Sequence, residues 1–114
     1  MADCIFCKIV AGEVPADIRY QDDKLIAFRD VNPLAPTHLL IIPRKHIPSL
    51  LEVFDAETSL IGDMAGVANQ LAKREGIAQK GYRLVINCGL QGGQGVAHLH
   101  MHLLGGRHLS SSLG

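Results

Sequence analysis

The chain has 114 residues, of which 47% are hydrophobic, and it carries eleven basic and eleven acidic residues. This length fits one domain with a modest core. Because no basic stripe or charge block is present, we expect no nucleic-acid polymer as partner. The longest aliphatic run, residues 39–42, is too short to cross a bilayer, so no membrane partner is expected either.

The N-terminal residues contain no basic segment followed by an apolar run, and we therefore expect no signal peptide. The chain has three cysteines, an odd number, which fits reduced thiols better than a disulfide framework. Both observations predict a cytoplasmic location.

The first third of the chain predicts a short helix and a hairpin. Asp3 is a suitable cap for a helix over residues 4–11, and Gly12 would end it. Residues 18–20 and 25–28 are apolar segments on either side of a polar turn, which is typical of a β-hairpin.

The remaining elements follow an irregular connection that contains two prolines. Residues 37–42 predict a buried strand that Pro43 stops. Apolar residues at spacings of three and four predict a long helix over residues 55–75. Two further strands are expected over residues 82–87 and 97–104. Strand pairs without intervening helices indicate an antiparallel sheet with the helices on one side, an α+β layout.

The last predicted strand carries His98, His100 and His102 at alternate positions, directly after a glycine-rich loop over residues 89–95. Because side chains alternate along a strand, the three imidazoles should share one face. A merely polar face would accept Lys, Thr or Glu equally well. Two chemical interpretations stay open: a transition-metal site, or one nucleophilic imidazole with two helpers that acts on phosphorus. Glycine N–H groups can approach a phosphate closely, which favours the second interpretation.

The motif His-Leu-His-Met-His-Leu-Leu matches the pattern of the histidine triad (HIT) superfamily. Gly-Tyr-Arg-Leu-Val-Ile-Asn, Gly-Gly-Gln, Leu-Leu-Gly-Gly-Arg and Ala-Pro-Thr-His resemble its Hint branch, and the similarity runs from about Ile5 to Arg107. The resemblance implies a HIT-like fold with about five antiparallel strands, one long helix and a short N-terminal helix. It also implies a single HIT domain over residues 1–114 with a loose tail from about residue 108, and a homodimer that forms a continuous sheet.

The resemblance further implies an enzyme that hydrolyses purine nucleoside 5′-phosphoramidates, the P–N conjugates of AMP or GMP, without a cofactor in catalysis. His100 would be the nucleophile and would form a nucleotidyl-histidine intermediate. His102 would hold phosphate oxygens, with His38 and His98 in support.

The implied nucleotide contacts fall into three groups. Asp30 would accept both ribose hydroxyls, and Val31 would also contact the nucleotide. Apolar side chains would wall the base: Ile5, Phe6, Ile9 and Phe28. The phosphate would meet the triad and the glycine-rich loop at Asn87, Gly93, Gln94, Gly95 and Val96.

Two departures from the Hint pattern keep other functions open. Many Hint proteins carry a serine where this chain has Gly95 and an aromatic residue where it has Ala97. One alternative is a nucleotide-binding or protein-interaction module with vestigial activity. Another is a dinucleoside polyphosphate hydrolase or nucleotidyl transferase that uses the same nucleophile.

Cys4 and Cys7 form a C-x-x-C pair, which supplies half of a tetrahedral metal site. His46 and His98 are candidates for the other half. A thioredoxin-like redox pair would need a preceding strand that this N-terminus lacks, while two buried cysteines on one helix face remain an alternative. Similarity to bacterial HIT proteins with this motif implies a structural Zn²⁺ held by all four residues.

Overall fold

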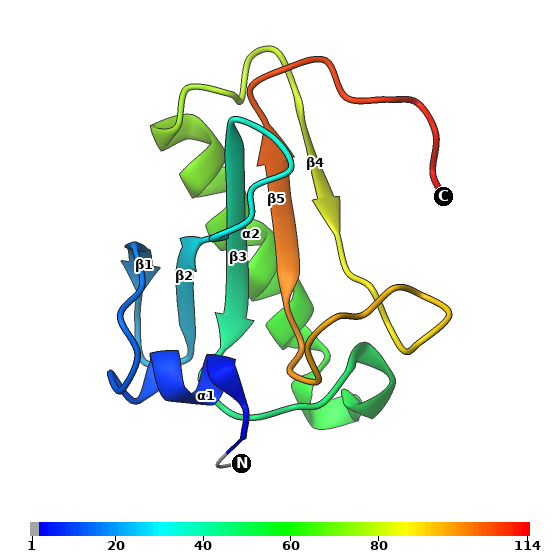
Figure 1. Ribbon diagram of the computed structural model, residues 1–114. Helices are drawn as coiled ribbons and strands as arrows, with labels where there is room; N and C mark the ends of the chain where they lie inside the picture. Colours follow the sequence, from blue (N-terminus) through cyan, green and yellow to red (C-terminus); the bar gives the residue numbers. More distant parts are fainter. Residues whose placement is uncertain (1–2) are drawn as a thin grey trace.

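A computed structural model describes residues 3–114 and contains a five-stranded sheet in the order β1-β2-β3-β5-β4 (Figure 1). Every neighbouring pair of strands is antiparallel, which confirms the predicted α+β layout. No helix in this described part is both long and apolar enough to span a bilayer. The elements are α1 (Ile5–Val10), β1 (Ile18–Gln21), β2 (Leu25–Arg29), β3 (Thr37–Pro43), the 3-10 turns η1 (Leu50–Glu52) and η2 (Asp55–Glu57), α2 (Ser59–Arg74), β4 (Tyr82–Val85) and β5 (Met101–Gly105).

The two helices cover opposite faces of the sheet, so the expectation of helices on one side is wrong (Figure 1). Helix α2 packs Met64 and Leu71 into one apolar cluster with Ile41 of β3. Helix α1 brings Phe6 into a second cluster with Leu40. Because successive side chains of a strand point to opposite faces, the buried central strand β3 supplies both clusters.

The helix ends differ from the predicted ones by a few residues. Helix α1 is capped by Cys4, whose sulfur accepts the Cys7 N–H at 3.3 Å, and not by Asp3. Residues 55–57 form a 3-10 turn, and the α-helical hydrogen bonds of α2 begin only at Ser59. Gly76 lies just beyond the end of α2 with φ +75°, the left-handed conformation that commonly terminates a helix.

The strand ends near the histidines also differ. Pro43 is the last residue of β3 and pairs with Leu25, rather than stopping the strand before it. Strand β4 ends at residue 85, and β5 begins only at Met101. Before Met101 the chain lies outside the ladder, and the Leu99 N–H donates instead to the carbonyl of Ile47, at 2.7 Å. His98 and His100 therefore precede the strand on which they were expected.

Candidate active site

Three imidazoles meet on the face of the sheet that α1 covers. His38 comes from β3, His102 from β5, and His100 from the extended segment before β5. The ring centroids of His100 and His102 are 5.0 Å apart, and those of His38 and His102 are 5.2 Å apart. His102 lies opposite Leu40 in the sheet, so both side chains point to the same face. The predicted alternation is thus kept although the ladder is shorter.

The ring of His100 is held in one orientation. Its Nδ1 lies 2.7 Å from the carbonyl oxygen of His98, and the ring packs nearly perpendicular to that of Phe6, with the two centroids 5.2 Å apart. Because a carbonyl oxygen only accepts, Nδ1 of His100 carries the proton. In the neutral imidazole the other nitrogen, Nε2, then keeps its lone pair. The site therefore presents a nucleophilic nitrogen on a ring that is only 5% exposed.

A chain of hydrogen bonds also sets the tautomers of the other two rings. The Leu34 N–H donates to Nδ1 of His38 at 3.0 Å, so a neutral His38 carries its proton on Nε2. That N–H donates to Nδ1 of His102 at 2.9 Å. His102 therefore carries its own proton on Nε2. Its outward nitrogen is a hydrogen-bond donor, on a ring whose centroid lies 5.0 Å from that of His100.

Burial favours the neutral form of the His38 and His102 rings. It is the main cause that lowers the pKa of His38, with Asp30 acting in the opposite direction. The pKa of His102 falls to about 4, first because of burial and then because of the nearby His100 and His38 rings. The Oδ2 atom of Asp30 lies 3.5 Å from Nε2 of His38, while Oδ1 accepts the Asn32 N–H at 2.9 Å. Asp30 thus joins the imidazole cluster, as a partly exposed acceptor.

The glycine-rich loop is shaped by two amide side chains. Nε2 of Gln94 donates to the carbonyls of Pro48 and Val96, and Oε1 accepts the Gly89 N–H. Asn87 donates to the carbonyl of Gly92 at 2.8 Å. Gly89 and Gly93 adopt positive φ, which side chains rarely tolerate. Both amides are therefore engaged with backbone groups and hold the loop in its conformation.

The apolar side chains expected to contact the nucleotide differ in how exposed they are. Phe6, Ile9 and Phe28 are buried in one cluster, and the rings of Phe6 and Phe28 are 5.4 Å apart. Ile5 is 42% exposed and Val31 is 89% exposed. Of the buried side chains, Phe6 packs against the rings of His98 and His100, and the exposed pair is accessible to a ligand.

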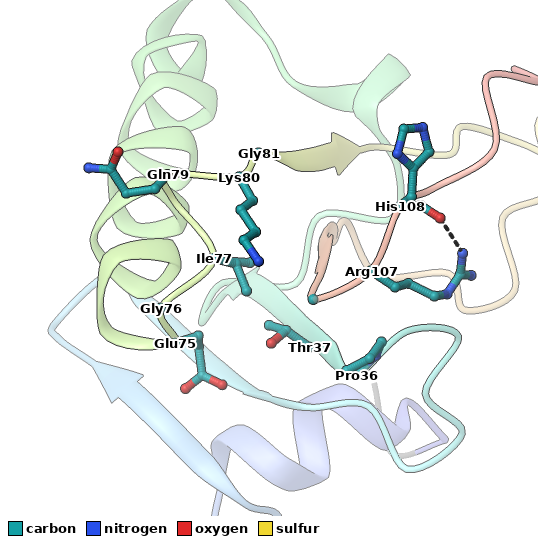
Figure 2. A pocket seen from close by; sticks show the side chains of 11 residues that line it. Pro36, Thr37, Glu75, Gly76, Ile77, Gln79, Lys80, Gly81, Arg107 and His108 are labelled. Atoms are coloured by element: carbon teal, nitrogen blue, oxygen red, sulfur yellow. Dashed lines mark hydrogen bonds between the residues drawn. The ribbon is translucent and has the colours of Figure 1, made fainter.

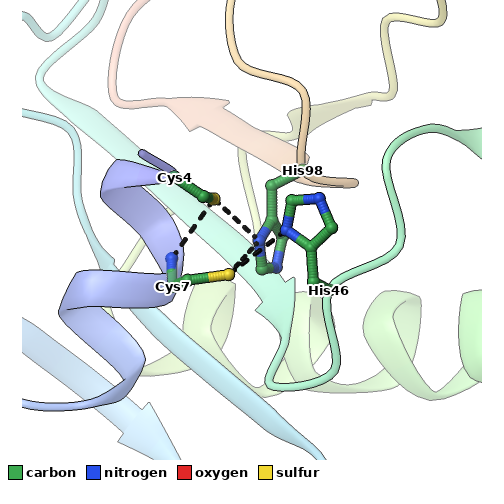
Figure 3. Close-up of side chains that lie close together, drawn as sticks. All are labelled: Cys4, Cys7, His46 and His98. Atoms are coloured by element: carbon green, nitrogen blue, oxygen red, sulfur yellow. Dashed lines mark hydrogen bonds between the residues drawn. The ribbon is translucent and has the colours of Figure 1, made fainter. Parts of the chain in front are cut away.

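A second cluster joins helix α1 to the sheet (Figure 3). Cys4 Sγ lies 3.3 Å from Nδ1 of His98, and Cys7 Sγ lies 3.2 Å from Nδ1 of His46. In a tetrahedral zinc site with Zn–S near 2.3 Å and Zn–N near 2.0 Å, neighbouring sulfur and nitrogen atoms are about 3.6 Å apart. All four ligand atoms lie within 4.8 Å of one another. The two thiols and two imidazoles therefore fit a tetrahedral metal ion.

His98 belongs to this cluster of two cysteines and two histidines rather than to the row of three imidazoles. Its Nε2 lies 2.8 Å from the carbonyl oxygen of Pro43 and donates to it, which leaves the Nδ1 lone pair directed at the cysteines. Its own carbonyl orients His100. Three backbone groups, at Leu34, Pro43 and His98, orient the imidazoles. The sequence does not predict these contacts, because every residue type has the same backbone groups.

An antiparallel sheet with a helix on each face and neutral imidazoles on its central strands defines the class of histidine triad proteins. Residues 11–109 match the family model described as HIT domain, and the chain belongs to this family. The predicted family and HIT-like fold are therefore confirmed.

Close relatives are known from sequence and structure. The chain is 51% identical over 111 residues to the purine nucleoside phosphoramidase of Escherichia coli K12, covering 97% of this chain and 93% of that protein. The HIT family hydrolase from Legionella pneumophila Philadelphia 1 superposes with a TM-score of 0.95 at 48% identity, covering 98% of this chain and 100% of the other. These relatives confirm the prediction of a hydrolase-type enzyme.

A more distant structure bears on the metal. The zinc-bound histidine triad family protein from Mycobacterium smegmatis has a TM-score of 0.82 at 26% identity, and the match covers 96% of this chain and 79% of that one. A zinc-bound protein therefore occurs among the structural neighbours of this fold.

Proposed function

We propose that this enzyme hydrolyses purine nucleoside 5′-phosphoramidates through a covalent intermediate on His100. The observation that carries the proposal is the hydrogen bond from Nδ1 of His100 to the His98 carbonyl, which directs an unprotonated Nε2 outward. The activity printed in the name of the E. coli relative, a purine nucleoside phosphoramidase, supports this substrate class.

The reaction proceeds in two displacements at phosphorus. Nε2 of His100 attacks, the P–N bond breaks, and the amine nitrogen takes up a proton from solvent as it leaves. Water then attacks the nucleotidyl-histidine, the P–Nε2 bond breaks, the water proton returns to solvent, and the nucleoside monophosphate is released. The outward N–H of His102 donates to a non-bridging oxygen as negative charge develops there in each transition state. His38 keeps that donor in place through its own Nε2–H.

The remaining contacts position the nucleotide. Asp30 accepts the ribose hydroxyls with its exposed lone pairs, and the loop N–H groups at Gly95 and Val96 hold the phosphate. The Gly93 N–H donates within the loop to the Leu90 carbonyl, so Gly93 acts by shaping the loop through its positive φ. Asn87 and Gln94 keep the phosphate-binding N–H groups aligned through the loop bonds described above. The base contacts the apolar side chains of α1 and β2, with Val31 at the rim: Ile5, Phe6, Ile9 and Phe28.

Hydrolysis of an adenosine phosphoramidate, followed as AMP release, tests the proposal. We expect turnover by the wild type and loss of about 10⁴-fold or more in His100→Ala, because the nucleophile is gone. His108→Ala is the matched control, since His108 is exposed in the C-terminal segment and should leave the rate unchanged. AMP binding without turnover in the wild type would contradict the proposal and favour a binding module. Faster cleavage of a dinucleoside polyphosphate would contradict the substrate class.

We also propose that Cys4, Cys7, His46 and His98 hold a structural Zn²⁺. The donor set and its spacing support this assignment. When bound, the ion would fasten the short helix α1 to the sheet. Elemental analysis should give about one zinc per chain for the wild type and much less for Cys4→Ser, whereas Cys88→Ser, outside the cluster, should retain it. Equal zinc in wild type and Cys4→Ser would contradict the assignment.

We propose a homodimer that extends the sheet through β4. In the described part of the chain β4 pairs only with β5, so its other edge is free to accept a second copy. Sedimentation should give twice the chain mass of 12.3 kDa. A monomer at micromolar concentration would contradict this proposal. The cytoplasmic location and the loose tail stay predictions.

A further inference from the structure

We infer that Arg107, outside the imidazole cluster, is a positioning residue that sets the tautomer of His102 through the backbone of Leu34. The inference goes beyond the proposed function and rests on it for its kinetic consequence. Its structural part, the link between an arginine and a proton position, can be measured in the protein without substrate.

Two hydrogen bonds on either side of one α-carbon connect the guanidinium to the imidazoles. Nη2 of Arg107 donates to the carbonyl oxygen of Leu34 at 2.9 Å. The N–H of the same Leu34 donates to Nδ1 of His38 at 3.0 Å. His38 in turn donates to Nδ1 of His102 at 2.9 Å. A continuous path therefore leads from the arginine to the proposed phosphate-binding nitrogen. It contains three hydrogen bonds, the backbone of Leu34 and the rings of His38 and His102.

The connection that contains Leu34 depends on such anchors. It lies between β2 and β3, outside the ladder of the sheet, and its two prolines have no N–H to donate. The Leu34 side chain is 69% exposed, so packing of that side chain does little to hold the backbone. The neighbouring Arg29 donates to the Pro36 carbonyl at 3.0 Å and holds only the end of the segment.

The guanidinium is itself fixed from two directions. Its other terminal nitrogen, Nη1, donates to the carbonyl oxygen of His108 at 3.1 Å (Figure 2). Arg107 and Pro36 also lie on the border of a pocket of about 680 Å³ between the β2–β3 connection, the α2–β4 connection and the C-terminal segment (Figure 2). Arg107 thus joins the C-terminal segment to the connection that contains Leu34.

Loss of this anchor would change where protons lie. When the Leu34 N–H no longer meets Nδ1 of His38, that nitrogen can carry the proton itself. Nε2 of His38 then accepts rather than donates, and His102 must place its proton on Nδ1 to keep the 2.9 Å contact. The outward nitrogen of His102 would become a lone pair, which repels a phosphate oxygen instead of binding it.

The kinetic consequence falls on the chemical step. The donor of His102 matters most when charge develops on the phosphate, so Arg107→Ala should lower kcat about 3- to 10-fold with KM changed less than 2-fold, a loss typical of one hydrogen bond. Arg107→Lys keeps one charged donor and should recover most of the rate. Arg44→Ala is the matched control, because Arg44 also donates to a backbone carbonyl, that of Asp22. Arg44 follows β3 and Arg107 follows the antiparallel β5, so the two arginines lie at opposite ends of these strands.

Two-bond ¹⁵N–¹H spectra of the imidazoles in ligand-free, zinc-loaded protein provide the decisive measurement. We expect His38 and His102 of the wild type and of Arg44→Ala in the Nε2–H form, and a substantial Nδ1–H fraction in Arg107→Ala that Arg107→Lys reverses. Unchanged tautomers in Arg107→Ala would overturn the inference, even if its activity fell. Altered tautomers in a protein without phosphoramidase activity would refute the proposed function alone. If Arg107→Ala does not fold, wild-type tautomers together with an unchanged kcat in Arg107→Met, which keeps a long side chain but has no N–H donor, would overturn the inference.

Discussion

The buried ring of His102 should make the protein lose stability as the pH falls below neutrality. In the unfolded chain a histidine has a pKa of about 6.5, whereas in the fold the pKa of His102 is about 4, chiefly because of burial. A base with a depressed pKa in the fold is neutral there while the unfolded chain takes up a proton. The contribution of the neutral His102 ring to the free energy of unfolding is thus present above pH 6.5 and is lost as the pH falls toward 4. Between pH 7 and pH 5 these two values give a loss of about 2 kcal/mol in the free energy of unfolding.

Urea denaturation at pH 7 and pH 5 measures this loss. The comparison is wild type against His102→Gln, which cannot titrate but keeps a polar amide at the same position. Groups that do not contact His102 contribute equally to both proteins and cancel in this comparison. The wild type should lose about 2 kcal/mol more than the variant over this interval. If the two proteins lost the same free energy, the claim that burial keeps this ring neutral would be wrong.

Two other predictions concern glycines and the core. A Cβ at Gly92 would lie 2.3 Å from the Cys88 carbonyl oxygen, whereas one at Gly95 would meet nothing within 4 Å. In urea denaturation, Gly92→Ala should therefore lower the free energy of unfolding by about 1–3 kcal/mol. Gly95→Ala should lower it by less than about 0.5 kcal/mol. Equal costs would contradict the loop geometry. Met64→Ala, at a fully buried position, should cost about 2–5 kcal/mol. Leu51→Ala is its control, because Leu51 is 81% exposed and should change the midpoint little; a small effect of Met64→Ala would contradict its place in the core.

The sequence predicts the type of each main element but not where it ends. The spacing of Met64, Val67 and Leu71 correctly indicates the amphipathic helix, and the apolar run of β3 correctly indicates a buried strand. The start of β5 could not be read in this way. It depends on the hydrogen bond that the Leu99 N–H donates to the Ile47 carbonyl, outside β3. This bond is a tertiary contact, which the local sequence does not reveal. For the same reason alternation within strands could not show that α1 and α2 cover different faces.

For the candidate site, the sequence predicts which residues take part but not which ring nitrogens carry protons. The residue types of the histidine motif and of the C-x-x-C pair are sufficient to predict two chemically active clusters. They cannot show which nitrogen of each ring carries a proton, because carbonyl and N–H groups of Pro43, His98 and Leu34 decide that. These groups belong to every amino acid, and only folding selects which of them meets an imidazole.

The two uses of His98 separate the requirements on its side chain from those on its backbone. The carbonyl that orients His100 would be supplied by any residue at this position, since it belongs to the main chain. The imidazole contacts the sulfur-containing cluster through Nδ1 and donates to the Pro43 carbonyl through Nε2. The proposed hydrolysis thus uses the first histidine of the motif through its main chain, whereas the metal proposal uses its ring. In a chain designed without the cysteines, a side chain of similar size would still have to donate to the Pro43 carbonyl at this position.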